Sequence, residues 1–353
     1  MSQKPDEASA SDSGARPVPR TQQAIVQLRY GAVRDVLALA EAVPVRAPGP
    51  QEVQIHVRAA SLNPIDWQTI EGNRRLIARR CFPFTPLFDL AGVVTEVGHG
   101  VTSFRTGDRV HADNEVHGGG ASQYANIPAR LLAHVPAELD FAESAALPLA
   151  AQTAMTCLDR GRVAAGTRVA VIGASGGVGH FVVQLARAAG AHVVGVASAR
   201  NHEFVRSMGA DEAIDRHETD LSASFGADSF DVVIDCVGGR EQWTRAQHVL
   251  RPGGRFVTIA RDEDGVVTPA SAARLLSTIT ARRLRGAGPR GRKYVPVFLK
   301  ASGDLQRRVN ALAETGQLRA HLSRTFPLTL EGVHAAVEES RAGRTVGKLV
   351  LLR

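Results

Sequence analysis

Cysteine is scarce in this chain, and its scarcity excludes two common ways of stabilising a fold. Only Cys81, Cys157 and Cys236 occur among 353 residues, far apart in the sequence and odd in number. A disulfide framework needs paired cysteines, and a common type of structural zinc site needs four that lie close together. The sequence therefore predicts neither a disulfide framework nor a four-cysteine zinc site.

Lysine is also scarce, although the chain is basic. Lys and Arg together number 42 against 35 Asp and Glu, which gives a formal net charge of +7, and only Lys4, Lys293, Lys300 and Lys348 are lysines. The basic excess is therefore arginine, whose planar guanidinium suits bidentate contacts with phosphate or carboxylate. This balance indicates an anionic partner, and a nucleotide cofactor, a nucleic acid or an acidic substrate would all fit it.

Long apolar runs are missing as well. No stretch of 18 or more apolar residues occurs, so the sequence predicts no membrane span. Residues 1–20 are polar and lack the apolar segment of a secretory signal, and their acidic residues argue against an organellar transit peptide. We expect a disordered tail there and a cytoplasmic location for the protein.

Two patterns divide the rest of the chain. Residues 24–136 alternate apolar and polar side chains in short runs bounded by Gly and Pro, which predicts an antiparallel β domain. From about residue 143 to 285, short apolar strands alternate with helical stretches, which predicts βαβ units on a buried parallel sheet. Expected strands there are 168–172, 192–197, 231–235 and 255–259. Helices near 300–315 and 330–342 and a last strand at 348–352 follow.

A glycine-rich turn carries the most specific local signal. Residues 169–179 read VAVIGASGGVG, and an amphipathic helix is expected over 176–189. Gly176 and Gly179 match the second and third glycines of the G-x-G-x-x-G pattern, while Ala174 holds the first place. Glycine lets the chain turn sharply and approach a pyrophosphate, which the N–H groups of the helix N-terminus then bind. The strand–turn–helix context predicts a Rossmann-type dinucleotide site, although a tight turn without a ligand would look the same.

The end of the next strand predicts which dinucleotide binds. An NAD site usually has Asp or Glu there to bond the ribose 2′-hydroxyl, but residues 196–201 read VASARN. Ser198 could bond a 2′-phosphate and Arg200 could neutralise it, and Arg216 is a further, weaker candidate. We therefore predict NADPH as the cofactor. Alternatively, Arg200 only opens the next helix in solvent.

An ordered series of motifs resembles the medium-chain dehydrogenase/reductases, and within them the zinc-independent quinone oxidoreductase-like (zeta-crystallin-like) group. The resemblance spans about residues 24–352. Besides the glycine turn, the motifs are 61–66 (SLNPID), 89–98 (DLAGVVTEVG), 107–110 (GDRV), 118–124 (GGGASQY), 145–154 (AALPLAAQTA), 235–239 (DCVGG), 250–254 (LRPGG) and 347–351 (GKLVL).

The resemblance implies a GroES-like β-rich catalytic domain joined to a Rossmann domain with a doubly wound parallel sheet, the active site lying in the cleft between them. It also implies that the C-terminal strand returns to the catalytic domain. We therefore divide the chain into a tail (1–20), the catalytic domain (21–145), the nucleotide-binding domain (146–317) and the return (318–353). The resemblance further implies a homodimer.

The same resemblance assigns residues to the cofactor and the cleft. Those it places near the cofactor are Asn63, Thr153, Ser175, Gly176, Gly177, Val178, Val237 and Lys348. Asn63 could instead form a turn before Pro64, and Thr153 could be a packed hydroxyl. With Asn63, the candidate catalytic groups in the cleft are Asp66, Trp67 and Tyr124.

Three positions depart from the pattern of the group. Trp67 stands where quinone reductases often have Tyr, Phe88 where relatives often have Gly, and Arg216 where they often have Tyr. The choice of substrate therefore stays open.

No metal site is expected. Asn63 stands where alcohol dehydrogenases of the superfamily have a ligand Cys, and residues 87–92 lack their ligand His. His111, Asp113, Glu115 and His117 have side chains of ligand type, but we expect a solvated or turn role for them.

Without a strong Lewis acid, hydride transfer favours acceptors that stabilise their own charge. We therefore predict NADPH-dependent reduction of quinones or of C=C bonds conjugated with a carbonyl. One alternative is an enoyl-thioester reductase whose arginines bind CoA or carrier phosphate. Another is a non-catalytic NADPH-binding protein that binds RNA, as reported for some zeta-crystallin relatives. The sequence shows no RNA-binding module, so nucleic acid is not an expected partner.

Overall fold

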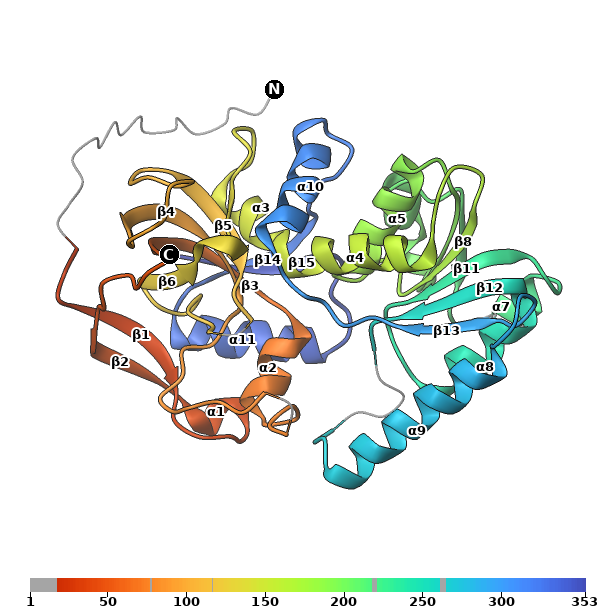
Figure 1. Ribbon diagram of the computed structural model, residues 1–353, viewed down its shortest axis with the longest axis horizontal. Coiled ribbons are helices and arrows are strands. Elements are labelled where there is room, and N and C mark those ends of the chain that lie inside the picture. The colour runs from red at the N-terminus through yellow and green to blue at the C-terminus, as the bar shows by residue number, and fades with distance from the viewer. Residues whose placement is uncertain (1–17, 77, 116, 218–220, 261–264) are drawn as a thin grey trace.

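A computed structural model describes residues 18–76, 78–115, 117–217, 221–260 and 265–353. The tail predicted over 1–20 lies outside the described residues except for its last three. Two large β-sheets organise the chain, and Figure 1 shows them side by side, with the last strand of the chain within the first sheet and the last helix packed against it. No helix in the described ranges combines the length and apolar character needed to cross a membrane.

The first sheet is mainly antiparallel and takes strands from both ends of the chain. Its central order is β14-β15-β3-β4-β5-β7, and β6 pairs with β3. A separate hairpin, β1 with β2, lies beside it. The strands are β1 (Thr21–Gln27), β2 (Leu37–Pro44), β3 (Glu52–Leu62), β4 (Asp89–Val97), β5 (Arg109–Asp113), β6 (Tyr124–Pro128), β7 (Ala133–His134), β14 (Leu322–Pro327) and β15 (Lys348–Leu352). The helices are α1 (Val33–Val36), α2 (Pro64–Ile70), η1 (Ala129–Leu131), α3 (Phe141–Ala146) and α11 (Leu330–Arg341).

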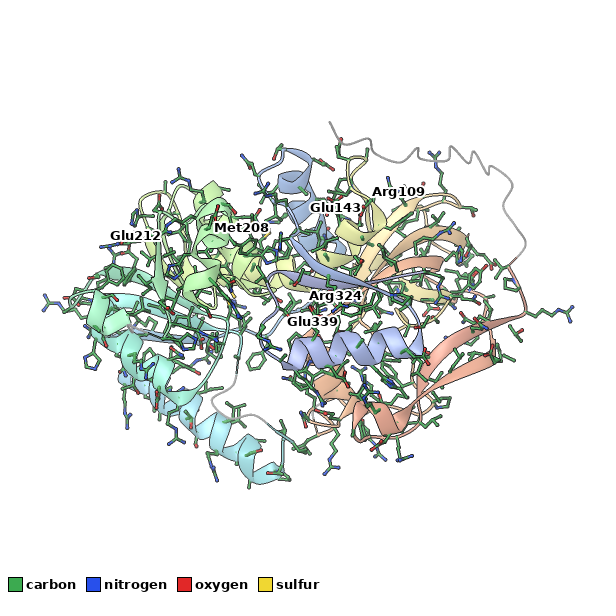
Figure 2. All side chains as sticks on the ribbon, turned by 180° about the vertical axis from the view of Figure 1, so that it is seen from behind. Arg109, Glu143, Met208, Glu212, Arg324 and Glu339 are labelled. Atoms are coloured by element: carbon green, nitrogen blue, oxygen red, sulfur yellow. The ribbon has the colours of Figure 1, made fainter. Side chains whose placement is uncertain are left out.

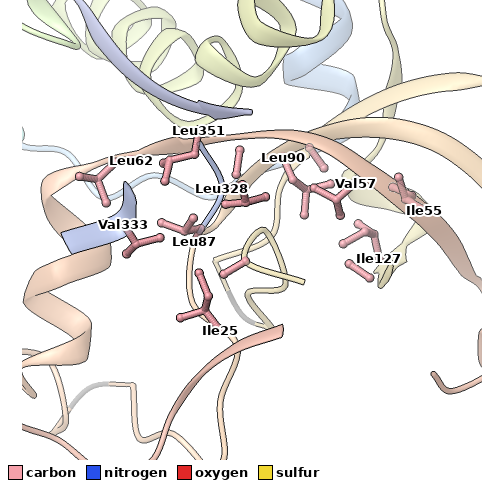
Figure 3. Packing of buried hydrophobic residues seen from close by; sticks show 14 of the residues in the cluster. Ile25, Ile55, Val57, Leu62, Leu87, Leu90, Ile127, Leu328, Val333 and Leu351 are labelled. Atoms are coloured by element: carbon pink, nitrogen blue, oxygen red, sulfur yellow. The ribbon is translucent and has the colours of Figure 1, made fainter. Parts of the chain in front are cut away.

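The core of this part lies beneath the first sheet. Figure 3 shows Leu62, Leu90 and Leu351 from three strands converging on it, and all three are buried. Helix α11 covers one end through the buried Val333. An ion pair links α11 to β14, where Arg324 Nη1 lies 3.0 Å from Glu339 Oε2 (Figure 2).

The second sheet has six parallel strands in the order β10-β9-β8-β11-β12-β13. The predicted α/β class with a doubly wound parallel sheet is therefore confirmed. The strand order reverses between β8 and β11, which makes a crevice at their carboxyl ends where nucleotides bind in such sheets. The strands are β8 (Arg168–Ile172), β9 (His192–Ala197), β10 (Glu212–Asp215), β11 (Phe230–Asp235), β12 (Leu250–Thr258) and β13 (Lys293–Pro296). The helices are α4 (Pro148–Gly161), α5 (Gly179–Ala188), η2 (Ala199–Asn201), α6 (His202–Ser207), α7 (Leu221–Ser224), α8 (Arg240–Val249), α9 (Pro269–Arg285) and α10 (Gly303–Glu314).

Candidate active site

The glycine turn joins β8 to α5 at the crevice. Gly173 adopts φ +79°, a region that favours glycine, and a Cβ on Gly179 would lie 2.0 Å from the carbonyl oxygen of Gly173. A Cβ on Gly176 would meet only that oxygen within 4 Å among the described residues, at 3.3 Å. Gly179 is therefore needed for the turn itself, whereas Gly176 leaves room beside the helix N-terminus for a ligand.

A cavity of about 290 Å³ lies against this turn. Five residues that the sequence analysis assigned to the cofactor line it: Ser175, Ser198, Arg200, Arg216 and Val237. Polar groups that the sequence analysis missed complete the lining, among them Asn201, Arg245 and Arg344. Asn201 Nδ2 donates to Ser175 Oγ at 3.1 Å, and Arg245 pairs with Glu241 at 2.8 Å. No Asp or Glu lies among the described residues that line the cavity, so its charge favours an anion.

Asn63 and Lys348 meet in a buried polar cluster at the end of β3. Asn63 Nδ2 donates to Asp89 Oδ2 at 2.8 Å, and Lys348 Nζ donates to Asn63 Oδ1. The ammonium also lies 3.7 Å from Asp89 Oδ2. Ser61 Oγ donates to the same carboxylate oxygen at 3.0 Å, and the N–H of Leu149 donates to Asp89 Oδ1 at 2.8 Å. Asn63, Asp89 and Lys348 are at most 4% exposed, so the contacts fix the orientation of the Asn63 amide.

Two further assigned residues adjoin this cluster. Asp66 caps α2, its Oδ2 accepting from the N–H of Asn63 at 2.7 Å and its Oδ1 from the N–H of Phe88 at 3.0 Å. Burial raises the pKa of Asp66 to about 7. Thr153 Oγ1 donates to the carbonyl of Leu149 at 2.7 Å, one helical turn beyond the N–H that Asp89 binds. Asp66 and Thr153 are both buried.

The polar cluster and the cavity are joined through the glycine turn. The N–H of Gly347 donates to the carbonyl of Ser175 at 2.9 Å. A Cβ on Gly177 would lie 3.5 Å from Lys348 Cδ, so the lysine side chain passes beneath the turn. Val178 ends the turn as the N-cap of α5. The glycine turn therefore contacts both the cavity, through Ser175, and the polar cluster, through Gly347 and Lys348.

Comparison with known proteins identifies the family of this chain. Residues 49–137 match a family described as alcohol dehydrogenase GroES-like domain, and residues 208–351 match one described as zinc-binding dehydrogenase. The chloroplast envelope quinone oxidoreductase homolog of Arabidopsis thaliana is 42% identical over 320 residues, which cover 88% of this chain and 92% of the relative. This chain belongs to the medium-chain dehydrogenase/reductase superfamily.

Two further similar proteins support the same family assignment. The chloroplastic NADPH-dependent alkenal/one oxidoreductase of A. thaliana is 31% identical over 347 residues, covering 95% of this chain and 80% of the relative. The structure of the quinone oxidoreductase from Coxiella burnetii superposes with a TM-score of 0.78 at 27% identity, covering 94% of this chain and 99% of that one. The predicted family, with its quinone oxidoreductase-like relatives and GroES-like domain, is thus confirmed.

The structure does not bring all the assigned residues of this medium-chain dehydrogenase/reductase together. The ring of Tyr124 stacks on His56, with centroids 4.9 Å apart, and Tyr124 pairs with His56 in the sheet register. His56 precedes Asn63 by seven residues along β3, so Tyr124 lies well away from the Asn63 amide. Trp67 turns toward α11, where its Nε1 donates to Ser340 Oγ at 3.2 Å.

The residues of ligand type divide into buried and exposed ones. The expected solvated or turn role is wrong for His111, which is fully buried. Asp113 is also fully buried, but its Oδ1 accepts the N–H of Glu115 two residues on, which is a turn contact, and His117 is exposed. His111 bonds the carbonyl of Ser144 through Nδ1 at 2.9 Å and Asn310 through Nε2 at 3.0 Å, while burial lowers its pKa to about 4. Both its nitrogens are therefore engaged. Within the described ranges, no three His, Cys, Asp or Glu side chains form a group that could hold a metal ion.

Proposed function

We propose that the protein is an NADPH-dependent reductase that transfers hydride to quinones or to C=C bonds conjugated with a carbonyl, without zinc. The observation that carries the proposal is an arginine-lined cavity, with no Asp or Glu among the described residues that line it, against the same glycine turn that contacts Lys348, the hydrogen-bond partner of Asn63. The names of relatives that reduce quinones or alkenals support the same substrate class.

The residues present fit a dinucleotide with a 2′-phosphate. Ser198 offers a hydroxyl at the end of β9, and Arg200 and Arg216 line the same cavity. The space beside Gly176 suits the close approach of a pyrophosphate to backbone N–H groups. When bound, the dinucleotide supplies the hydride. The protein contributes by holding the reacting groups in line and by donating hydrogen bonds to the acceptor oxygen on which negative charge develops.

Asn63 is the residue we propose to meet the substrate carbonyl. Its Oδ1 accepts from Lys348 and one Nδ2 hydrogen is bound by Asp89, which leaves a second N–H of fixed direction. A fixed donor stabilises a developing enolate or quinol oxygen without reorganising during the reaction.

Coenzyme choice is tested by comparing KM for NADPH and NADH in the wild type and in Arg200→Ala, with Arg285→Ala on the exposed face of α9 as the control. A charge-assisted contact is worth about 1.5–3 kcal/mol, so the loss of Arg200 should raise KM for NADPH about tenfold or more and leave NADH nearly unchanged. Equal KM values in the wild type, or tighter NADH, would overturn the preference.

Substrate class is tested by following NADPH oxidation with a panel of quinones, enones and enoyl-CoA esters. Turnover of quinones or enones is the expected result, and activity on crotonyl-CoA far above both would favour the enoyl-thioester reductase. A salt-sensitive RNA shift without any turnover would favour the RNA-binding alternative. One tightly bound zinc per purified chain would contradict the zinc-free mechanism. The homodimer and the cytoplasmic location remain predictions from the sequence.

A further inference from the structure

Three strands place a row of polar side chains on one buried face of the first sheet. Ser61 on β3 is the register partner of Asp89 on β4, and Asp89 is the register partner of Asp113 on β5. Register partners on antiparallel strands have Cβ atoms about 4.5–5.5 Å apart, so the two carboxyl groups are neighbours. Both are fully buried, which makes two adjacent negative charges there very unfavourable.

Hydrogen bonding distinguishes the two carboxyl groups. Asp89 accepts from Ser61, Asn63 and the N–H of Leu149, and the Lys348 ammonium lies 3.7 Å away, all of which favour its ionised form. Asp113 accepts only the N–H of Glu115, at 3.0 Å, and its Oδ2 has no partner among the described residues. The proton of the pair therefore belongs on Asp113.

The charged groups around Asp113 support this assignment. Asp89, Glu115 and Asp66 all act to keep a proton on Asp113, and burial, the largest cause, also raises its pKa well above the usual range. Lys348 on β15 is the cation that faces all three buried aspartates. Burial lowers the pKa of Lys348, which makes its ammonium a better acid.

The row reaches from the surface to the candidate site. Glu115 follows Asp113 by two residues and is partly exposed, with an ion pair to Arg74 at 2.8 Å. At the other end, Lys348 donates to Asn63, the residue proposed to meet the substrate. Glu115, Asp113, Asp89 and Lys348 therefore form a row of ionisable side chains between the partly exposed Glu115 and the buried Asn63.

We propose that Asp113 stores a proton at neutral pH, and that Asp113, Asp89 and Lys348 form a relay that supplies the proton consumed by the reduction. The step rests on the proposed function. Hydride addition to the C=C bond moves an electron pair onto the carbonyl, and the resulting enolate takes a proton from the Lys348 ammonium as its N–H bond breaks. The neutral amine regains a proton from Asp113 through the Asp89 carboxylate. Asp113 is reprotonated from solvent by way of Glu115.

The stored proton is tested without turnover by infrared spectroscopy of the full chain at mildly alkaline pH, where Asp66, whose pKa is raised to about 7, is mostly ionised. The wild type should show the C=O stretching band of a protonated carboxylic acid, and this band should be missing in Asp113→Asn. Asp231→Asn, which alters a carboxylate paired with Arg251 at the opposite end of the second sheet, should keep the band. If the wild type lacks the band, the proposal is wrong, whatever the enzyme reduces.

The relay is tested with the best acceptor found in the panel. Asp113→Asn keeps the shape and neutrality of the protonated side chain, so its fold and its KM for NADPH should be retained. Its turnover should fall about a hundredfold, as expected for loss of a positioned acid, with a larger solvent deuterium isotope effect. Lys348→Arg keeps the positive charge but holds its proton too tightly to donate it, and should show the same loss. Wild-type turnover and isotope effect in Asp113→Asn would overturn the relay, whereas absence of any acceptor would count against the proposed function alone.

Discussion

Single buried carboxyl groups make the stability of this protein depend on pH. Burial raises the pKa of Asp113 well above its ordinary value of 3.8, so the folded chain binds the proton more tightly than the unfolded chain. The free energy of unfolding should therefore fall as the pH rises from about 3.8 toward the raised pKa. Asp113→Asn cannot titrate and should gain stability relative to the wild type across this range, as measured by urea unfolding at several pH values.

The control for this prediction is Asp231→Asn, whose carboxylate is paired with Arg251 and partly exposed. Its stability relative to the wild type should not rise with pH in the same way. A constant difference between Asp113→Asn and the wild type at all pH values would show that Asp113 has an ordinary pKa.

At the scale of single residues, the sequence predicted which residues belong to the candidate site but not which side chains they contact. Asn63 and Lys348 were each assigned to the cofactor, yet their hydrogen bond joins residues 285 positions apart. His111 and Asp113 were expected in a solvated or turn role, and of the two only Asp113 makes a turn contact, with the N–H of Glu115. Their burial depends on Asn310 and Asp89, which other elements bring to them, and no local pattern contains that information.

At the scale of elements, two glycines of the glycine turn have different roles. Gly179 is required because a side chain would overlap the backbone, whereas Gly176 leaves space for a ligand. In Gly179→Ala the new methyl group would overlap the carbonyl of Gly173, so the variant should lose about 3 kcal/mol of unfolding free energy. Gly176→Ala meets only a 3.3 Å contact, so it should stay within about 1 kcal/mol of the wild type. Its methyl group would stand where a pyrophosphate approaches, and KM for NADPH should rise about tenfold or more.

Gly226→Ala is the matched control, because a Cβ at that position meets nothing within 4 Å. It should change neither the thermal midpoint nor KM. Equal losses of stability in Gly176→Ala and Gly179→Ala would contradict the division of roles within the turn.

The strands of the second sheet could be predicted well, and one helix could not. The expected strands at 168–172 and 192–197 have the observed bounds, because buried parallel strands are short continuous apolar runs. Helix α9 was missed, since Arg282 is its one buried residue and the apolar periodicity is correspondingly weak. Its signal was the N-terminus, where Thr268 and Ser271 form a capping box on either side of Pro269, the first helical residue.

At the scale of the whole molecule, the last strand completes the sheet begun by the first third of the chain. Leu351 on β15 is fully buried in the core shown in Figure 3, whereas its neighbour Leu352 is 37% exposed. Leu351→Ala should cost about 3 kcal/mol through lost contacts and a cavity, and Leu352→Ala less than about 1 kcal/mol. Thermal and urea unfolding measure both changes, and similar losses for the two would show that β15 is not anchored through its inward face.

The return of the chain to its first sheet was expected from the family resemblance, and the order of strand and helix patterns along the chain had already suggested it. An apolar strand at 348–352 was evident, but its partner was not, because strand pairing over almost 300 residues leaves no periodic trace. The structure pairs β15 antiparallel with β3, from Leu349 opposite Leu62 to Leu352 opposite Ala59. The domain boundaries at 145, 317 and 318 remain predictions.

This pairing has a consequence for biosynthesis. Synthesis proceeds from the N-terminus, and domains usually fold in that order as they leave the ribosome. Here half of one edge of β3 stays open until β15 emerges, and the strands of the parallel sheet all emerge before β15. An open strand edge invites pairing with other chains, so the nascent protein is exposed to aggregation until β15 has been made.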